Sequence, residues 1–385
     1  MKRLLVLLRA LLLGATFAQD PVRIGVNMEL SGAYASLGQP GLEGAQVAQQ
    51  QMGEVLGRPV ELSVCDNATT AETSIACANR FVDEGVVAVI GAGSSGMSIP
   101  AAEVLQAAGI PMVSVSSTNP ATTQIGDYIF RIAYTDDFQG RVAARYAFED
   151  LGSSRAAIFR AQDDDYSFGL GGFFDEEFRA LGGETVVVDY TTNTVDYSAQ
   201  INDLRGFEPD VIYFAGFPVS GVNLIPQLRQ QGFDQQILGA DASDTPELPE
   251  GAGEAVNGML FTGFGGAEVL TGEAATRASD FQTMFGTEMP NGTFNGFTLA
   301  GADAYNVVVE AIRLADSTDH AAVRDALANL TDYPGVSGNI TFAGTDGTPA
   351  DRTIAFFEYQ VPGADGAPWS KETSFGLSTG GDEGN

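Results

Sequence analysis

Two short apolar segments on either side of one helical segment constrain the fold of this chain more than any other feature. The first, Val86–Ile90, ends in a Gly/Ser turn, and the second, Pro111–Val115, ends in the hydroxyl-rich turn 116–120. Residues 99–108 between them have helical periodicity. Two strands joined in this way form a βαβ unit and lie parallel as neighbours. Both polar turns are therefore expected at the carboxyl edge of one sheet, where open α/β folds bind ligands.

The Gly/Ser turn is open to several interpretations besides a plain connecting loop. Backbone N–H groups and hydroxyls at a helix start suit a carboxylate or another small anion, and we favour this interpretation. The segment Gly91-Ala-Gly93-Ser-Ser-Gly96 also matches the dinucleotide fingerprint, but no acid follows about twenty residues later to hold a ribose. Residues 92–96 also resemble a nucleophile elbow, whose triad would require His320, the single histidine of the chain.

Strand and helix patterns alternate along the rest of the chain. Strands are predicted at 22–28, 60–65, 128–132, 156–160, 185–190, 211–214, 236–239, 339–342 and 353–359. Helices are predicted at 41–52, 70–83, 138–151, 168–181, 198–205, 220–231, 273–285, 297–315 and 319–330. This pattern predicts an α/β fold with two doubly wound βαβ lobes joined by a multi-stranded hinge.

The predicted lobes are discontinuous in sequence, because we expect the helices after residue 272 to return to the first lobe. Lobe 1 is then 19–137 plus 263–345, and lobe 2 is 138–262 plus 346–364. Residues 365–385 are rich in Gly, Ser and Asp and are predicted to be a mobile tail.

The chain begins with the features of a secretory signal peptide. Lys2 and Arg3 precede the apolar run Leu4–Leu13, which is too short to span a membrane. Small residues then precede a cut after Ala18, so residues 1–18 are predicted to be removed. No cysteine follows that cut to accept a lipid, so we expect an exported, soluble protein.

The acidic composition excludes whole classes of partner. The chain has 50 acidic and 19 basic residues, a net charge of −31, which repels nucleic acid and anionic membranes. A Cys/His metal site is not expected with one histidine and two cysteines, Cys65 and Cys77. An oxidising compartment allows these cysteines to pair, although a strand end and a helix could also hold them apart.

Three residues that follow strands of the second series are candidates for ligand binding. Tyr166 lies at a strand-to-helix turn, within Asp163-Asp-Asp-Tyr-Ser-Phe-Gly169. Asp241 lies just past the strand at 236–239 and would either cap a turn or face a ligand crevice. Phe217 follows the strand at 211–214 and would either line an apolar pocket or belong to the core.

Together these features resemble the periplasmic ligand-binding proteins of branched-chain amino-acid ABC transporters, the leucine/isoleucine/valine-binding type. The resemblance covers nearly all of the mature chain. It rests on Ile24-Gly-Val-Asn-Met-Glu-Leu-Ser31-Gly32, Gly44-Ala45, Val89-Ile-Gly-Ala-Gly-Ser94-Ser95, Ser114-Val-Ser116-Ser-Thr118-Asn119-Pro120, Asp165-Tyr166-Ser-Phe-Gly169 and Gly239-Ala-Asp241.

The resemblance implies ligand-binding roles for the two polar turns of the first lobe. Ser95 and Thr118 would bind the α-carboxylate of the ligand through their O–H and N–H groups. Ser94 precedes Ser95 in the same turn and is expected to bind ligand with it. Ser116 would offer its carbonyl oxygen to the α-ammonium group.

The second lobe would complete the site. The resemblance implies that Tyr166 contacts the polar head of the ligand and that Asp241 pairs with its ammonium group. Phe217 and Leu37 fall where leucine-binding members of the family have tyrosine. These two departures leave the preferred ligand side chain open.

The function implied is that of a periplasmic receptor, a monomer without cofactor, metal or catalysis. It would capture a small amino acid, branched-chain or otherwise apolar, and deliver it to an inner-membrane ABC permease. The residues fit a zwitterion, because hydroxyls and helix-start N–H groups suit a carboxylate and an acid suits an ammonium. Two alternatives stay open: a receptor or sensor of the same fold for an amide, urea or aromatic acid, and, more remotely, an exported serine hydrolase.

Overall fold

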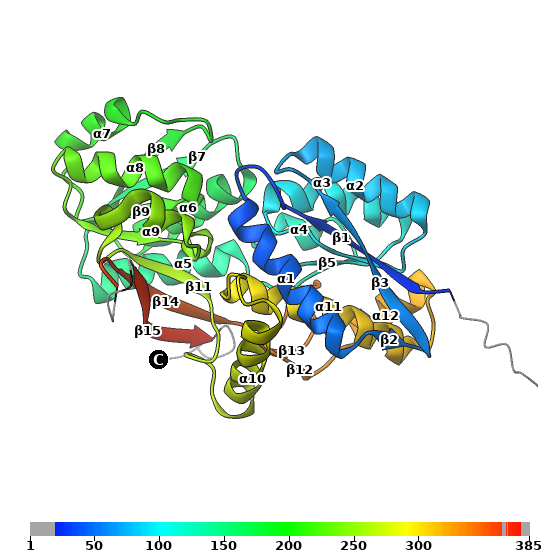
Figure 1. Cartoon of the computed structure of the whole chain (residues 1–385). Helices are drawn as coiled ribbons and strands as arrows, with labels where there is room; N and C mark the ends of the chain where they lie inside the picture. Colours follow the sequence, from blue (N-terminus) through cyan, green and yellow to red (C-terminus); the bar gives the residue numbers. More distant parts are fainter. Residues whose placement is uncertain (1–19, 364–366, 368, 379–385) are drawn as a thin grey trace, which may run out of the picture.

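The computed structural model describes residues 20–363, 367 and 369–378, and these form two α/β lobes side by side (Figure 1). The predicted signal peptide, residues 1–18, lies outside the described residues. Each lobe is built on one mainly parallel sheet with helices on its faces, so the predicted fold class is confirmed. Within the described chain, three segments pass between the two sheets, at 132–135, 265–271 and 341–352.

The sheet of the first lobe has the order β2-β3-β1-β4-β5-β6. Its strands are parallel except for the short β2, which pairs antiparallel with β3. They are β1 (Val22–Met28), β2 (Glu54–Val55), β3 (Arg58–Asp66), β4 (Ala88–Gly91), β5 (Met112–Ser114) and β6 (Ile129–Arg131). The helices of this lobe are α1 (Ala35–Gln51), α2 (Ala71–Glu84), α3 (Ser95–Ala108), α4 (Ala121–Gln124), α10 (Gly272–Glu288), α11 (Gly296–Ala315) and α12 (His320–Ala328).

The sheet of the second lobe has the order β15-β14-β11-β10-β9-β7-β8. Its strands are β7 (Arg155–Ala161), β8 (Glu184–Tyr190), β9 (Val211–Ala215), β10 (Gln236–Gly239), β11 (Leu260–Phe264), β14 (Thr353–Gln360) and β15 (Ser370–Ser378). The main helices are α5 (Asp136–Arg145), α6 (Asp165–Ala180), α7 (Ser198–Asp203), α8 (Pro218–Gln230) and α9 (Glu247–Ala252). A small separate ribbon pairs β12 (Tyr333–Gly335) with β13 (Gly338–Ile340).

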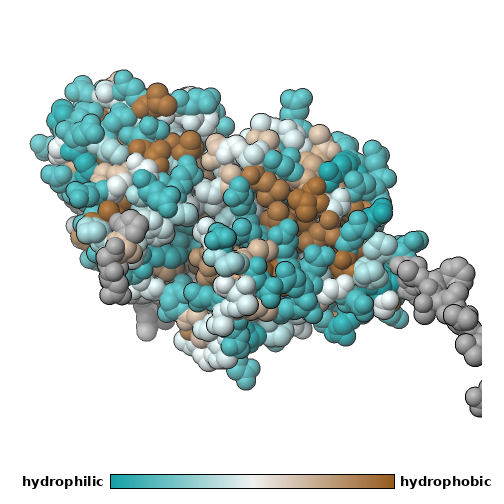
Figure 2. All heavy atoms as spheres, in the orientation of Figure 1, coloured by the Kyte–Doolittle hydropathy of each residue, from teal (hydrophilic) through white to brown (hydrophobic). Residues whose placement is uncertain are grey.

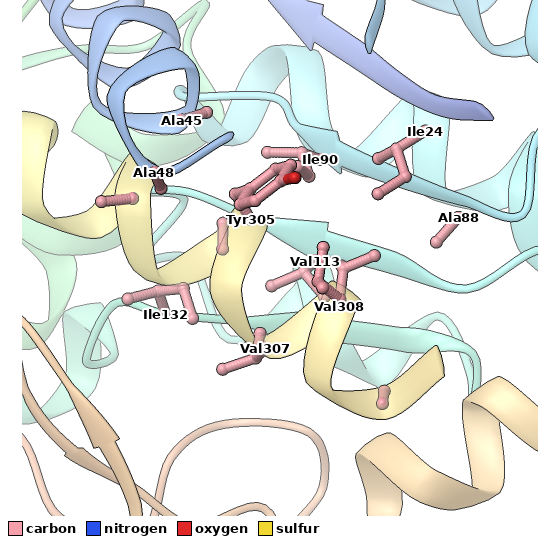
Figure 3. Packing of buried hydrophobic residues seen from close by; sticks show 14 of the residues in the cluster. Ile24, Ala45, Ala48, Ala88, Ile90, Val113, Ile132, Tyr305, Val307 and Val308 are labelled. Atoms are coloured by element: carbon pink, nitrogen blue, oxygen red, sulfur yellow. The ribbon is translucent and has the colours of Figure 1, made fainter. Parts of the chain in front are cut away.

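Alternating side chains of the first sheet bury opposite faces, as the two-residue period of a strand requires. On β4, Ala88 and Ile90 pack with α1 and α11, whereas Val89 packs with α2 and α3. Figure 3 shows Tyr305, Val307 and Val308 of α11 among residues of the central strands. The sequence-distant helix α11 therefore belongs to the first lobe.

Glycines bring α1 and α11 into close contact. A Cβ atom at Gly44 would lie 1.9 Å from the Thr298 carbonyl oxygen, and one at Gly301 would lie 2.0 Å from the Gly41 carbonyl oxygen. Backbones this close leave no room for side chains, so these positions require glycine. The packing fixes α1, whose first turn carries Leu37, relative to the sheet.

Some elements differ from the prediction. Helix α1 begins at Ala35 rather than Gly41, and it includes Pro40 in its second turn, whereas a proline at that position in the sequence indicates a helix boundary. Strand β11 was not predicted, since Leu260–Phe264 is a short apolar run without a following helix pattern. The expectation of a mobile tail at 365–385 is wrong for Ser370–Ser378, which pairs antiparallel with β14.

Three further observations concern the chain as a whole. A disulfide joins Cys65 at the end of β3 to Cys77 in α2, with the two Cα atoms 5.8 Å apart. Among the described residues, no helix is both long enough and apolar enough to cross a membrane. The face in Figure 2 is largely hydrophilic, with its largest apolar area on the first lobe and smaller ones on the second.

Candidate functional site

The turns that follow β4 and β5 are held together by hydrogen bonds at the carboxyl edge of the first sheet. The Ser114 hydroxyl donates to the Ala92 carbonyl oxygen at 2.9 Å, and the Ser116 hydroxyl donates to the Gly93 carbonyl oxygen at 3.0 Å. The predicted βαβ unit is thus present, with β4 and β5 paired in parallel. Each turn positions the other, so the two present one surface to the cleft.

Ser95 and Thr118 have hydrogen-bonding capacity to spare. The Ser95 hydroxyl oxygen accepts from the Ser117 hydroxyl at 3.0 Å and from the Asn119 N–H at 3.2 Å. With both lone pairs used, its own proton is free to be donated. The buried Thr118 hydroxyl has no hydrogen bond of ordinary geometry in the described chain, although it lies near enough to the Asp136 carboxyl group to lower the pKa of that group. The first N–H groups of α3, beginning at Ser95, also have no partner within the helix.

Ser94 lies at the pocket but uses its donors elsewhere. Its N–H and its hydroxyl both donate to Glu29 Oε1, at 2.9 and 2.7 Å. Glu29 directly follows β1 and is fully buried, and sequence reasoning did not single it out. Burial raises the pKa of Glu29, while the bonds from Ser94 and Gly93 act in the opposite direction. The arrangement does not support the expectation that Ser94 donates to a ligand directly.

Asp241 lies at the carboxyl end of β10, on the second-lobe side of the pocket. Its Oδ1 atom accepts from the Tyr166 hydroxyl at 2.7 Å and from Gln139 Nε2 at 2.9 Å. Burial raises its pKa to about 6, against the lowering effect of these two hydrogen bonds. The carboxyl group of Asp241 is therefore poorly stabilised as an anion unless a cation comes close.

A second buried acid, Asp136, lies beside Asp241 and was missed by sequence reasoning. Gln139 Nε2 approaches Asp136 Oδ1 at 3.4 Å as well as Asp241, so one amide joins the two carboxyl groups. Burial, and then the charge of Asp241, raise the pKa of Asp136 well above its usual range. The only sequence signal was an acid at the N-terminus of a predicted helix, which is also the mark of an ordinary helix start.

Aromatic side chains form the apolar part of the site. The Tyr34 and Phe217 rings are stacked with centroids 3.8 Å apart, and the Tyr166 and Phe217 centroids are 5.0 Å apart. Phe217 was expected either to line a pocket or to belong to the core, and it does both. Its side chain is buried, at 3% exposure, and it lines the pocket. Phe297, at the start of α11, also lines the pocket and was not singled out from the sequence.

These groups surround one small pocket between the lobes. All seven residues expected to bind ligand line it, together with four others. The lining residues are Leu37, Gly93, Ser94, Ser95, Ser116, Thr118, Tyr166, Phe217, Asp241, Ala242 and Phe297.

The lobes contact each other around the pocket mouth. Ser36 of α1 donates to Glu247 of α9 at 2.7 Å, and the Tyr34 hydroxyl donates to Asp164 at 3.3 Å. Asn119 Nδ2 donates to the Asp165 carbonyl oxygen at 2.8 Å. The structure is thus a closed arrangement in which both lobes contribute to a single enclosed site.

The serine hydrolase alternative lacks the geometry that it requires. His320 Nε2 is 2.9 Å from the carbonyl oxygen of Val86, which precedes β4, whereas Ser94 and Ser95 follow β4. The histidine and the serines therefore lie toward opposite edges of the sheet, and no triad is assembled. No cluster of three or more potential metal ligands occurs among the residues that the structure describes.

Comparison with known proteins agrees with the geometry. The family model for periplasmic binding proteins matches residues 21–367. A Leu/Ile/Val-binding protein of Rhizobium johnstonii is 29% identical over 368 residues, which cover 94% of this chain and 98% of the relative. The Leu/Ile/Val-binding protein homolog 2 of Brucella abortus is 30% identical, with 92% of this chain and 93% of the relative covered.

Solved structures give the same result. The crystal structure of a leucine-binding protein from Thermotoga maritima superposes with a TM-score of 0.86 at 30% identity, covering 92% of this chain and 98% of that protein. The matching family is one of substrate-binding proteins rather than of enzymes. The chain therefore belongs to the periplasmic binding protein family, and its resemblance to the receptors of branched-chain amino-acid ABC transporters is confirmed.

Proposed function

We propose that this receptor captures a small apolar amino acid between its lobes and delivers it to an inner-membrane ABC permease, acting as a monomer and without catalysis. The observation that carries the proposal is the opposite character of the two walls of one pocket. Donors with free protons face it from the first lobe, and a buried acid, Asp241, faces it from the second. A zwitterion satisfies both walls, whereas a ligand with one charge leaves a buried polar group without a partner.

The carboxylate of the ligand binds at the start of α3. Ser95 supplies its hydroxyl proton and a helix-start N–H, and Thr118 supplies the hydroxyl that has no hydrogen bond of ordinary geometry in the described chain. The positive end of the helix dipole adds to these bonds. Ser94 acts behind this contact, through its bonds to Glu29.

The ammonium group of the ligand binds at Asp241. Tyr166 orients the Asp241 carboxylate through its hydroxyl, and the Ser116 carbonyl oxygen offers a further acceptor from the first lobe. A second buried carboxyl group, that of Asp136, lies behind Asp241, and a nearby cation would lower the raised pKa of both acids. A cation is therefore favoured at this position over a neutral group.

The ligand side chain lies against Leu37, Phe217, Phe297 and Ala242. These groups are apolar, and the pocket that they line is small. A branched aliphatic side chain fits this description. The names of the Rhizobium and Brucella relatives support the same choice.

The receptor works in the periplasm after removal of residues 1–18. The small residues before the cut after Ala18, and the absence of a following cysteine that could accept a lipid, support a free N-terminus at Gln19. Mass spectrometry of the exported protein checks the cut. An intact Met1 in the periplasmic fraction would contradict it.

A thermal-shift screen of the mature protein against amino acids, amides, urea and aromatic acids tests the proposed ligand. A ligand at about 100 times its Kd adds about 2.7 kcal/mol to stability, which a melting curve resolves. Branched-chain amino acids are expected to give the largest shifts. A screen led by an amide, urea or an aromatic acid would identify the alternative receptor of the same fold, and turnover of an ester substrate would identify a hydrolase.

A further inference from the structure

Glu29 is the one buried acid of the first lobe that lies directly behind the proposed carboxylate site. Its side chain is fully buried at the end of β1, next to β4 in the sheet. Three donors from the turn after β4 meet it: Gly93 N–H at 3.0 Å, Ser94 N–H at 2.9 Å and the Ser94 hydroxyl at 2.7 Å. A carboxylate of the protein itself is therefore bound at this turn.

Both the side chain and the backbone of Glu29 are closely packed against glycines. A Cβ atom at Gly93 would lie 2.8 Å from Glu29 Oε2, so a larger residue would push the carboxylate away. A Cβ atom at Gly38, on α1, would lie 2.2 Å from the Glu29 carbonyl oxygen. The backbone of Glu29 is thus packed under α1 while its side chain holds the turn, which leaves the turn little freedom to shift.

The hydrogen bonds also determine which donors remain for a ligand. Both carboxylate oxygens of Glu29 accept, so an ionised side chain matches all three donors, and the start of α3 favours that charge. Gly93 and Ser94 are occupied by these bonds. The next residue, Ser95, is the first at this helix start whose N–H is left for another acceptor.

We propose that Glu29 is a positioning residue for the carboxylate half of the ligand site, holding Gly93 and Ser94 so that the donors of Ser95 are aimed into the pocket. This inference rests on the proposed amino-acid function. Glu29 does not line the pocket and touches no ligand atom; it acts through the turn. Its loss should weaken recognition of the carboxylate and leave recognition of the ammonium group intact.

Glu29→Gln tests this role, because the amide keeps the size of the side chain but places an N–H₂ group against backbone N–H donors. L-leucine and L-leucinamide, which keeps the ammonium group but has a neutral amide in place of the carboxylate, are each titrated into the wild type and the variant. We expect the affinity for L-leucine to fall by about tenfold or more, as the loss of one charge-assisted bond implies, and the affinity for L-leucinamide to change by less than about threefold.

Two matched variants complete the experiment. Glu43→Gln makes the same substitution at a half-buried acid of α1 that does not line the pocket, and it should leave both affinities within about twofold. Ser94→Ala removes only one of the three bonds to Glu29, so it should give a smaller loss with the same selectivity for L-leucine. It also provides the test if Glu29→Gln does not fold.

The outcomes separate this inference from the proposed function. Equal losses for L-leucine and L-leucinamide would show general damage to the site and overturn the positioning role. Unchanged or tighter binding of L-leucine by Glu29→Gln would overturn it too, the latter by showing that charge repulsion dominates. If the wild-type protein bound no amino acid, the proposed function itself, on which this inference rests, would be wrong.

Discussion

Single residues in this protein obtain their chemistry from burial more than from their type. Asp241 would be an ordinary ionised acid at a surface turn, but in the closed site its pKa rises to about 6 because water is excluded. Asp136 beside it is in the same condition, and one amide, Gln139 Nε2, is shared between them. These two buried carboxyl groups accept few hydrogen bonds, so a nearby cation would stabilise their ionised forms.

Asp241→Ala should abolish tight amino-acid binding without unfolding the protein. The ammonium group would be left buried without its partner, at a cost of about 3–5 kcal/mol, which is on the order of a few hundred- to a few thousand-fold in affinity. Asp241→Asn should lose less, because the amide oxygen still accepts a hydrogen bond. Calorimetric titration gives the ranking, with Asp137→Asn, the next residue to Asp136 but ion-paired to Arg141 at the surface, as control. Binding by Asp241→Ala within threefold of the wild type would rule out a zwitterionic ligand.

Ligand affinity should depend on pH in the range in which Asp241 titrates. In the closed arrangement the pKa of Asp241 is raised to about 6, so without ligand its carboxyl group binds a proton there at mildly acidic pH, whereas the ligand ammonium favours the ionised form. Affinity should therefore rise with pH up to neutrality and fall below about pH 6, by up to about tenfold per pH unit for one released proton. Calorimetry in buffers of different ionisation enthalpy counts that proton. No proton release between pH 5 and 7 would contradict the raised pKa.

The sequence predicted pocket residues only where they lie in a turn that follows an apolar strand. Ser95, Thr118, Tyr166 and Asp241 follow apolar runs in turns, so their place at the sheet edge follows from the fold. Glu29 also follows a strand, but its role depends on which groups surround it, and no local pattern encodes that. Asp136, Gln139 and Phe297 enter the site through long-range packing of helices.

At the scale of elements, helix α11 packs the later segment of the first lobe against its N-terminal segment. Its capping box, formed by Asn295 and Thr298, sets the helix start next to the pocket, and its glycine contacts with α1 set the depth of packing. The helical period of 297–315 predicted this helix almost residue for residue. Its position against β4 and α1 could not be read locally, since periodicity gives the buried face but not its partner.

Gly44→Ala should destabilise the protein. The new methyl group would lie 1.9 Å from the Thr298 carbonyl oxygen, so the two helices must move apart, at a cost of roughly 1–3 kcal/mol. Urea unfolding, followed by circular dichroism, measures the change. Gly286→Ala is the matched control, because Gly286 is an exposed residue of α10 with no atom close to its Cβ position, and there the substitution should be neutral or stabilise by up to about 1 kcal/mol. Equal effects at both positions would refute the close-packing explanation.

The link between β3 and α2 should be covalent in the exported protein. Cys65 and Cys77 are 12 residues apart, and closing a loop of this length contributes roughly 3 kcal/mol in the chain-entropy model. Counting free thiols under denaturing, non-reducing conditions should give none. Two reactive thiols per chain would disprove the bridge, and Cys65→Ser/Cys77→Ser should lower the unfolding midpoint.

At the scale of the whole molecule, the closed arrangement brings two chemically opposite walls together. The first lobe offers hydroxyl and N–H donors at the ends of β4 and β5, and the second offers Asp241 and Tyr166. The order of strands and helices predicted both lobes, because alternating patterns permit few topologies. The contacts between the closed lobes could not be predicted from a sequence pattern, because they join distant residues, as in the hydrogen bond between Ser36 and Glu247, which are 211 positions apart.

The most direct measurement compares L-leucine with two analogues that each lack one charge. The purified mature protein is titrated calorimetrically with L-leucine, with L-leucinamide, which lacks the carboxylate, and with 4-methylpentanoate, which lacks the ammonium group. We predict one L-leucine bound per chain and at least about hundredfold weaker binding of each analogue, since each leaves one buried wall without its charged partner. Binding of 4-methylpentanoate as tight as that of L-leucine would contradict a site built for a zwitterion.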